Sequence, residues 1–415
     1  MIFERSSTMK KTYKSLSAIA LAGTMIMGMN LTAFAAGEET QDTVNTESAA
    51  NTAVTETIEV GSDNTATLTK AMQIANHDGY VYEPTITYTY TLANGTAAGT
   101  VTDSTDLTVN YKAGDISYLA DPAAITQDAV FSQENEVTAE DGISSKELSW
   151  TFDPAAFPSA GVYRYTVTEQ ASVDPASIGI VRNDAYDTEK FLDVYVQNEG
   201  AGQIIAGMVL VDDEANAVTA ASAKSSGWNT AEDLESYTTY NMTVTKQITG
   251  AGADMTAKFP FTVTLTGEMG HANIVTEGSE GTNYTQFALG ENTAEAVVNS
   301  TLGHNETLTI KGLPTTVNFV INEENQTADT YKATAAAEGI TLTANANDSD
   351  LNGNGNLDVA SGAMAQAEAF VAINVTNNLD AISPTGVILR YAPYVLILAA
   401  GIVIFALSRR REKED

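Results

Sequence analysis

Threonine-rich segments with alternating apolar and polar residues fill most of this chain, and they constrain its fold more than any other feature. In residues 85–92 every second residue is apolar and the residues between them are threonines, and residues 259–265 follow a similar pattern. Alternation with a period of two predicts a β-strand that is buried on one face. Long amphipathic helical patterns are almost absent. We therefore predict an all-β protein.

An internal repeat divides the chain. Residues 67–70, with the sequence TLTK, recur as TVTK at residues 243–246, and the alternating pattern of residues 161–169 recurs at residues 315–323. Because the chain is too long for one β-sandwich, the repeat predicts tandem Ig-like β-sandwich domains. The predicted domains cover residues 58–240 and 241–380.

The two ends of the chain resemble export and membrane signals. Residues 1–35 contain lysines, an apolar run and a small-residue triplet, which is the order found in a secretory signal peptide. Residues 36–57 lack hydrophobic periodicity, which predicts a flexible leader. Residues 391–408 are apolar and precede a basic tail at residues 409–415. This pattern predicts a transmembrane helix with a cytoplasmic tail, so the precursor would be an exported single-pass protein.

Cysteine usage and charge narrow the classes of function. The sequence contains no cysteine, so an exported domain of this kind must be stabilised by its cores or by another covalent device. The formal net charge of −33 disfavours nucleic acid or anionic lipid as a partner. An acidic surface protein that is well solvated agrees with both observations.

Five polar residues share the apolar face of their predicted strands. They are Lys70, Glu169, Lys246, Glu323 and Asn377. Burial of such groups is costly unless they are paired, and it lowers the pKa of a lysine while raising that of a glutamate. A neutral Lys246 amine could then attack the Asn377 side-chain carbonyl, with Glu323 as acid and base. The product would be an isopeptide bond. The alternative is an ion pair at a sandwich edge with the asparagine exposed.

Several motifs are similar to those of the streptococcal pilin isopeptide-linkage family, the FctA-type backbone pilins. The most specific are Asn377, the sorting motif Ser383-Pro384-Thr385-Gly386, and Ala392-Pro393-Tyr394 at the start of the predicted helix. A Thr-Val-x-Lys strand ending at Thr249-Gly250 and a Tyr-x-Val-x-Glu box add to the resemblance. The resemblance implies pilin-type β-sandwiches in which Lys246, Glu323 and Asn377 form the isopeptide site of domain 2.

In domain 1 the resemblance implies Lys70 as the nucleophile and Glu169 as the acid and base. The chain has Glu235 where the family has the asparagine, and a carboxylate is a poor acyl donor. We therefore favour an unbonded cluster of Lys70, Glu169 and Glu235. A bond to Asn229 or Asn241 is the alternative.

Sortase processing is also implied by the resemblance. Within residues 381–390, a sortase would cut between Thr385 and Gly386, and an amine of peptidoglycan or of another pilin subunit would resolve the acyl-enzyme. At the position of the family's polymerising lysine this chain has Asp212 and Asp213, and Lys224 is the nearby lysine. Lys224 is therefore the candidate pilus amine. The sortase class stays open because no leucine starts the motif.

These features predict a cell-wall structural protein that is not an enzyme and needs no cofactor or metal. The alternatives are an anchored adhesin that does not polymerise and a carbohydrate hydrolase, which would need paired carboxylates in an open cleft. Residues 348–353 match half of a calcium loop, but Val359 occupies the place of the bidentate glutamate. A surface loop is the preferred interpretation of this segment. The histidines have no metal-ligand spacing.

Overall fold

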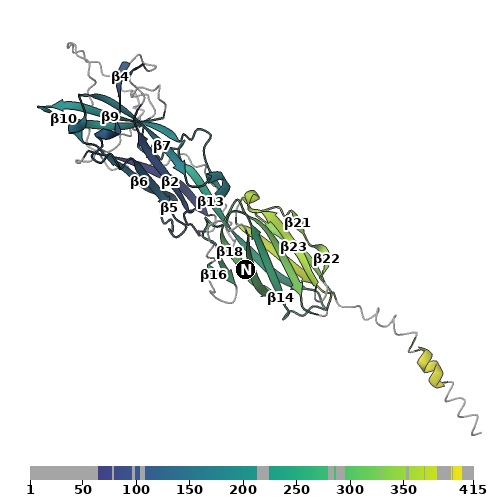
Figure 1. Ribbon diagram of the computed structural model, residues 1–415. Coiled ribbons are helices and arrows are strands. Elements are labelled where there is room, and N and C mark those ends of the chain that lie inside the picture. Colours follow the sequence, from purple (N-terminus) through teal and green to yellow (C-terminus); the bar gives the residue numbers. More distant parts are fainter. Residues whose placement is uncertain are drawn as a thin grey trace, which may run out of the picture. The chain divides into compact units, whose positions relative to one another are not determined.

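The structure is a computed structural model, and most of the residues that it describes lie in β-strands (Figure 1). It describes residues 64–76, 79–95, 99–102, 108–212, 224–278, 285–286, 295–327, 329–351, 355–368, 370–380, 394 and 396–403. The predicted signal peptide, flexible leader, sorting motif and cytoplasmic tail lie outside these residues. Within them, residues 394 and 396–403 are helical, and no helix has the length and apolarity that a membrane span requires. The transmembrane helix at residues 391–408 stays a prediction.

One sheet, here called the β7 sheet, has the order β11-β10-β9-β7-β2-β5, with β4 added beside β7 and β3 beside β4. Its strands are β2 (Ile86–Ala93), β3 (Gly99–Thr102), β4 (Thr108–Ala113), β5 (Thr126–Phe131), β7 (Gly161–Ala171), β9 (Glu189–Glu199), β10 (Gly202–Val211) and β11 (Lys224–Ser225). Short 3₁₀ helices η1 (Ile116–Tyr118), η2 (Pro154–Ala156) and η3 (Pro175–Ile178) lie in the connections. On β2 the apolar residues are buried and the threonines are partly exposed, which confirms the predicted alternation.

A second sheet, the β13 sheet, supplies the opposite layer of the first core. The strands involved are β1 (Thr65–Asn76), β6 (Ile143–Thr151), β8 (Ile180–Val181), β12 (Gly227–Trp228) and the start of β13 (Glu235–Thr249). Residues from both layers form one hydrophobic cluster, called the first core, which includes Leu68, Tyr90, Trp150, Tyr165 and Trp228. Burial of these large side chains provides the main stabilisation of this half.

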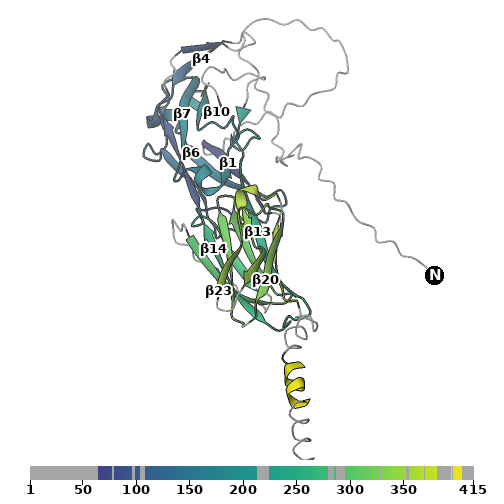
Figure 2. The same cartoon turned by 90° about the vertical axis from the view of Figure 1, so that its right-hand side faces the viewer.

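The second core lies between the rest of the β13 sheet and a third sheet, the β14 sheet (Figure 2). The first layer has the order β16-β15-β18-β13-β24-β20-β22, and the second has the order β17-β14-β19-β23-β21. Their bounds are β14 (Lys258–Thr266), β15 (Val275–Gly278), β16 (Thr285–Gln286), β17 (Glu295–Gly303), β18 (Thr307–Pro314), β19 (Asn318–Asn325), β20 (Tyr331–Glu338), β21 (Ala344–Asn345), β22 (Asn347–Leu351), β23 (Gly355–Ala363) and β24 (Val371–Asn378). The 3₁₀ helix η4 (Met364–Gln366) precedes β24. Alternating burial on β14 agrees with the sequence pattern.

Strand β13 contributes to both cores. Its first residues pair in parallel with β1, and its later residues pair in parallel with β24. The predicted domain boundary between residues 240 and 241 therefore falls inside a strand. The division into residues 58–240 and 241–380 remains a proposal. The first core uses residues up to Tyr237, whereas the second core includes Tyr240 as well as residues beyond the boundary.

Gly250 explains why β13 ends where it does. Its φ of 101° lies in the left-handed region, and a Cβ built there would approach the Leu379 carbonyl oxygen to 2.3 Å. Only glycine accepts both the conformation and the close approach of the backbone. The Thr-Gly pair noted in the sequence thus lets the chain turn beside the end of β24.

Candidate functional site

Three of the predicted residues meet inside the second core and are here called the second site. Lys246 lies on β13 and Asn377 on the adjacent parallel strand β24, while Glu323 projects from β19 of the opposite sheet. All three side chains are fully buried. The alternative of an ion pair at a sandwich edge with an exposed asparagine is therefore wrong.

Direct contacts join the members of the second site. Lys246 Nζ lies 2.7 Å from Glu323 Oε1, and Asn377 Nδ2 donates a hydrogen bond of 2.7 Å to the same oxygen. Among the described residues, Asn377 Oδ1 has no hydrogen-bond partner. The Phe259 ring centroid lies 4.7 Å from Lys246 Nζ and provides an apolar wall. The amine, the carboxyl group and the amide are thus held together in a dry environment.

Burial shifts the protonation of this pair toward neutral forms. Desolvation lowers the pKa of Lys246 to about 8, although the charge of Glu323 opposes the shift. Desolvation raises the pKa of Glu323, against the effects of Lys246 and Asn377. Transfer of one proton from Lys246 to Glu323 would leave a nucleophilic amine beside a carboxylic acid.

A corresponding cluster, called the first site, lies in the first core. Lys70 on β1 faces Glu169 on β7 and Glu235 on β13, and the three side chains are fully buried. Lys70 Nζ lies 2.8 Å from Glu235 Oε2 and 3.5 Å from Glu169 Oε2. This arrangement is the charged cluster that the sequence favoured.

Sequence reasoning missed further members of the first site. Arg182 Nη2 donates to Glu169 Oε1 at 2.6 Å, and its Nε donates to Glu235 Oε1 at 2.5 Å. Burial by itself lowers the pKa of Arg182. The hydrogen bond and the charge interaction with Glu235, together with the charge of Glu169, outweigh this effect, so the pKa is raised overall. Tyr186 donates to Glu169 at 2.5 Å and accepts from Lys70 at 2.6 Å, and the hydroxyl of Tyr90 also donates to Glu169. Two cations therefore face two carboxylates.

The two asparagines considered as alternatives make other contacts. Asn229 Nδ2 donates to Ser226 Oγ at 2.8 Å, and Asn241 Oδ1 accepts from Asn76 and from the Gly312 amide. Neither contact involves Lys70. Lys70 instead contacts Glu169 and Glu235, and the absence of a bond in domain 1 stays a prediction.

The candidate pilus amine lies on β11. The backbone of Lys224 is opposite Val211, the last residue of β10, so Lys224 is close in the sheet to Asp212. Asp212 itself pairs with the buried Lys190. Asp213 lies outside the described residues, and the role of Lys224 remains a proposal.

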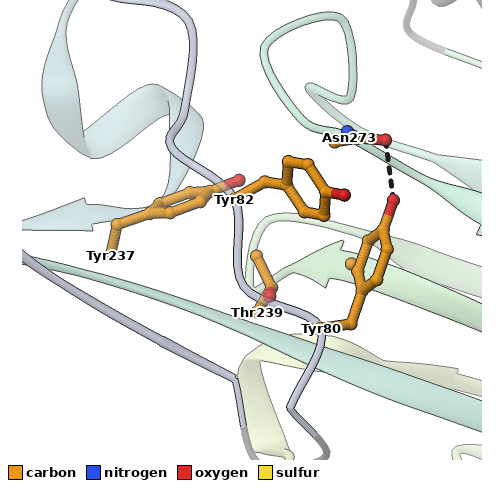
Figure 3. Close-up of a pocket in the computed structure, with 6 residues that line it drawn as sticks. Tyr80, Tyr82, Tyr237, Thr239 and Asn273 are labelled. Atoms are coloured by element: carbon orange, nitrogen blue, oxygen red, sulfur yellow. Dashed lines mark hydrogen bonds between the residues drawn. The ribbon is translucent and has the colours of Figure 1, made fainter. Parts of the chain in front are cut away.

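A small pocket separate from both sites is lined by tyrosines (Figure 3). Its empty volume is about 160 Å³, and the Tyr80 hydroxyl donates to Asn273 at 2.8 Å. The residues that line it are Tyr80, Tyr82, Tyr237, Thr239, Asn273 and Gly312. This pocket presents no carboxylate pair, and Glu169 and Glu323 are buried in the cores instead. These observations give no support to the hydrolase alternative.

The half calcium loop at residues 348–353 is described only in part, because Asn352 and Gly353 lie outside the described residues. Asp348 and Asp350 lie on β22, where Asp350 pairs with Lys332. In the described part of the chain, no group of three or more acidic or histidine side chains is placed to hold a metal. The sequence suggested a surface loop for this segment. Its first residues instead form part of β22, which pairs with β20 at the edge of the β13 sheet.

The fold and the second site together define a class: a protein whose described residues lie mostly in β-strands, with a buried cluster of a lysine, a glutamate and an asparagine. Residues 118–219 match the FctA family model, described as a Spy0128-like isopeptide containing domain. This match confirms the resemblance drawn from the sequence. Residues 240–354, which include Lys246 and Glu323, match a model described as a domain of unknown function (DUF7601).

Relatives with established names are distant. The chain is 24% identical over 283 residues to a pilin of Streptococcus pyogenes serotype M1, across 65% of this chain and 73% of the relative. The solved structure of the S. pyogenes major pilin T3.2 is 20% identical, with a TM-score of 0.41, and 76% of this chain and 98% of that chain are covered. A second S. pyogenes major pilin structure is 18% identical, with a TM-score of 0.43 and coverage of 76% and 99%.

Proposed function

We propose that this chain is a pilin-like structural subunit of the cell surface, stabilised by an autocatalytic isopeptide bond between Lys246 and Asn377. The observation that carries the proposal is the buried contact of an amine, a carboxyl group and an amide in the second site. The FctA match supports the pilin class.

The reaction follows from the contacts of the second site. Lys246 passes a proton to Glu323, and the neutral amine attacks Asn377 Cγ. Half a turn of the amide places Oδ1 against the protonated carboxyl group, which polarises the carbonyl during attack. The Nζ–Cγ bond forms, the Cγ–Nδ2 bond breaks, and ammonia leaves. Glu323 ends the reaction protonated, so protons and electrons balance without another reactant.

The folded protein supplies most of what this reaction needs. Folding already brings the reacting groups together, so the reaction itself does not carry the entropic cost of their lost translational freedom. The aromatic wall excludes water and favours the neutral amine. We therefore expect the bond to form in the folded chain without an enzyme.

The bond would compensate for the lack of disulfides. It joins two neighbouring strands and closes residues 246–377 into one loop. By analogy with disulfides, closure of a loop of this length contributes on the order of 4 kcal/mol, chiefly by restricting the unfolded chain.

Surface attachment forms the second part of the proposal. Sortase would cleave after Thr385 in the motif at residues 383–386, and the acyl group would pass to peptidoglycan or to an amine of another subunit. Lys224 is the proposed amine for polymerisation. Without a polymerising lysine, the same chain would be a singly anchored adhesin. A ladder of covalent multimers in cell-wall extracts distinguishes the two.

The bond is tested most directly by peptide sequencing. Digestion of the exported fragment, residues 58–380, should release a branched peptide that contains Lys246 and Asn377 and lacks one ammonia. Recovery of the two peptides in unbranched form would refute the proposed function. A Lys246→Ala variant provides the control for the branched signal.

A further inference from the structure

The first site repeats the backbone geometry of the second site. Lys70 lies two residues before Met72, which pairs in parallel with Glu235. Lys246 lies two residues before Ile248, which pairs in parallel with Asn377. Glu235 thus occupies the register position of the proposed electrophile.

The side-chain surroundings also correspond. Glu169 pairs across strands with Tyr90, as Glu323 pairs with Phe261. Lys70 Nζ lies 4.4 Å from the Tyr88 ring centroid, close to the 4.7 Å between Lys246 Nζ and the Phe259 ring. The aromatic wall and the inward glutamate are therefore present at both sites.

Two residues distinguish the first site. Glu235 replaces an amide with a carboxylate, whose negative charge makes its carbon a poor electrophile and which would have to lose water rather than ammonia. Arg182 binds both carboxylates of the cluster through separate nitrogens, at 2.6 and 2.5 Å. With Lys70 and Arg182 facing Glu169 and Glu235, all four groups can be charged at once, and neither a free amine nor a carboxylic acid is supplied.

We infer that the first site is a latent isopeptide site, in which Glu235 removes the electrophile and Arg182 holds the catalytic set in its charged, unreactive form. The ion cluster takes the place of a covalent link between β1 and β13. This inference rests on the proposed function of the second site. It assigns to Arg182 the role of a residue that blocks the reaction.

The test gives the first site the same set of groups as the second site, namely one lysine, one glutamate and one side-chain amide. In residues 58–380, Arg182→Gln together with Glu235→Asn leaves Lys70, Glu169 and an introduced amide. Lys70 Nζ would bond to the new amide carbon, the carbon–nitrogen bond of that amide would break, and ammonia would leave. We expect the intact mass to fall by a second ammonia, with a branched peptide that contains Lys70 and position 235.

Arg182 is tested separately from Glu235. Glu235→Asn alone keeps Arg182 on Glu169, so the second bond should form roughly 100-fold more slowly, the size of a lost general acid–base contribution. An equal rate in the single and double variants would remove Arg182 from the inference. Adding Glu169→Ala to the double variant should abolish the second loss and leave the first.

Folding and the second site have independent controls. The chain has two tryptophans, Trp150 and Trp228, and both are buried in the first core, so their fluorescence reports its folding. If the asparagine variant does not fold, Arg182→Gln with Glu235→Gln tests the same reaction with side-chain length preserved. A folded variant without a second ammonia loss overturns the inference.

The wild-type mass provides a further check. A second ammonia loss, or the loss of one water through formation of a Lys70–Glu235 amide, would show that the first site is already bonded. Either result would also overturn the inference. Absence of the first ammonia loss would instead refute the proposed function.

Discussion

Lys246 and Glu235 lie on the same strand, β13, yet their side chains belong to different cores. The two residues are an odd number of positions apart, so a regular strand would point their side chains to opposite faces of the sheet. Residues 239–242 are buried in succession, and the pairing with β18 is irregular between Tyr240 and Met242. This irregularity changes which residues are buried, and it lets one strand serve both sites.

The number of bonds can be counted by mass. Recombinant residues 58–380 should weigh less than their sequence by one ammonia, because the second site has an amide and the first has a carboxylate. Intact-mass spectrometry under denaturing conditions measures the difference. A mass equal to that of the sequence would eliminate the isopeptide bond altogether.

Glu323 should be required for the reaction. Glu323→Ala removes the group that accepts the Lys246 proton and polarises the Asn377 carbonyl, so the variant should fold without the bond. We expect a loss of about 4 kcal/mol in the free energy of unfolding and earlier cleavage by protease. Mass spectrometry and chemical denaturation provide the two measurements.

Asn377→Ala is the matched control for that variant. It also lacks the bond but keeps the ion pair between Lys246 and Glu323, so its destabilisation isolates the contribution of the bond. Ammonia loss at the normal rate in Glu323→Ala would contradict the proposed mechanism. Equal heat resistance with and without the bond would contradict its stabilising role.

Bond formation should depend on pH at both ends of the range. The reactive form shares one proton between Lys246 and Glu323. Above pH 8, which is about the lowered pKa of Lys246, the pair loses that shared proton and no acid remains. Below the raised pKa of Glu323 the pair binds a second proton, so the Lys246 amine is protonated and cannot attack. Refolding of unbonded protein from inclusion bodies, followed by mass, should show the highest rate between these limits. A rate that rises steadily beyond pH 9 would exclude Glu323 as the acid.

Arg182 should stabilise the first core. Arg182→Ala leaves Lys70 facing two buried glutamates, so we expect a cost of about 3 kcal/mol, the scale for breaking a buried ion pair. Chemical denaturation followed by tryptophan fluorescence measures it. The exposed pair of Lys332 with Asp350 provides a control, because Lys332→Ala should leave stability unchanged. Equal stability of both variants would show that the ion pairs of Arg182 do not stabilise the first core.

Polymerisation should depend on the proposed amine. Lys224→Arg keeps the charge but cannot be acylated in the same way, so high-mass ladders in wall extracts should disappear while single anchored subunits persist. Immunoblotting distinguishes these forms. Persistence of ladders would assign polymerisation to another lysine.

Strand parity was sufficient to predict that the three residues of the second site are buried. Glu323 alternates with apolar residues along β19, and Lys246 does so along β13, so the period of two placed both inside. The family resemblance also placed Glu235 at the position of the electrophile in domain 1, and the pairing of Met72 with Glu235 agrees with that placement. Local pattern was sufficient because each residue lies within a regular strand.

Arg182 could not be predicted in this way. It follows the two-residue strand β8 and lies outside the repeated segments, so neither parity nor repetition indicated its direction. The continuity of β13 was also missed, because the change in buried face near Tyr240 interrupts the alternation that marks a single strand. Both features depend on contacts between segments that are distant in sequence.

The parallel pairing of β13 with β24 has a mechanical consequence. Tension that enters at the carboxyl end of β24 and leaves toward the amino end of β13 would load these strands in shear, so their backbone hydrogen bonds would resist together. A covalent link from Lys246 to Asn377 would carry that load directly across the pair. The second core could then stay folded under forces that would otherwise extend it, while β13 passes the tension to its pairing with β1.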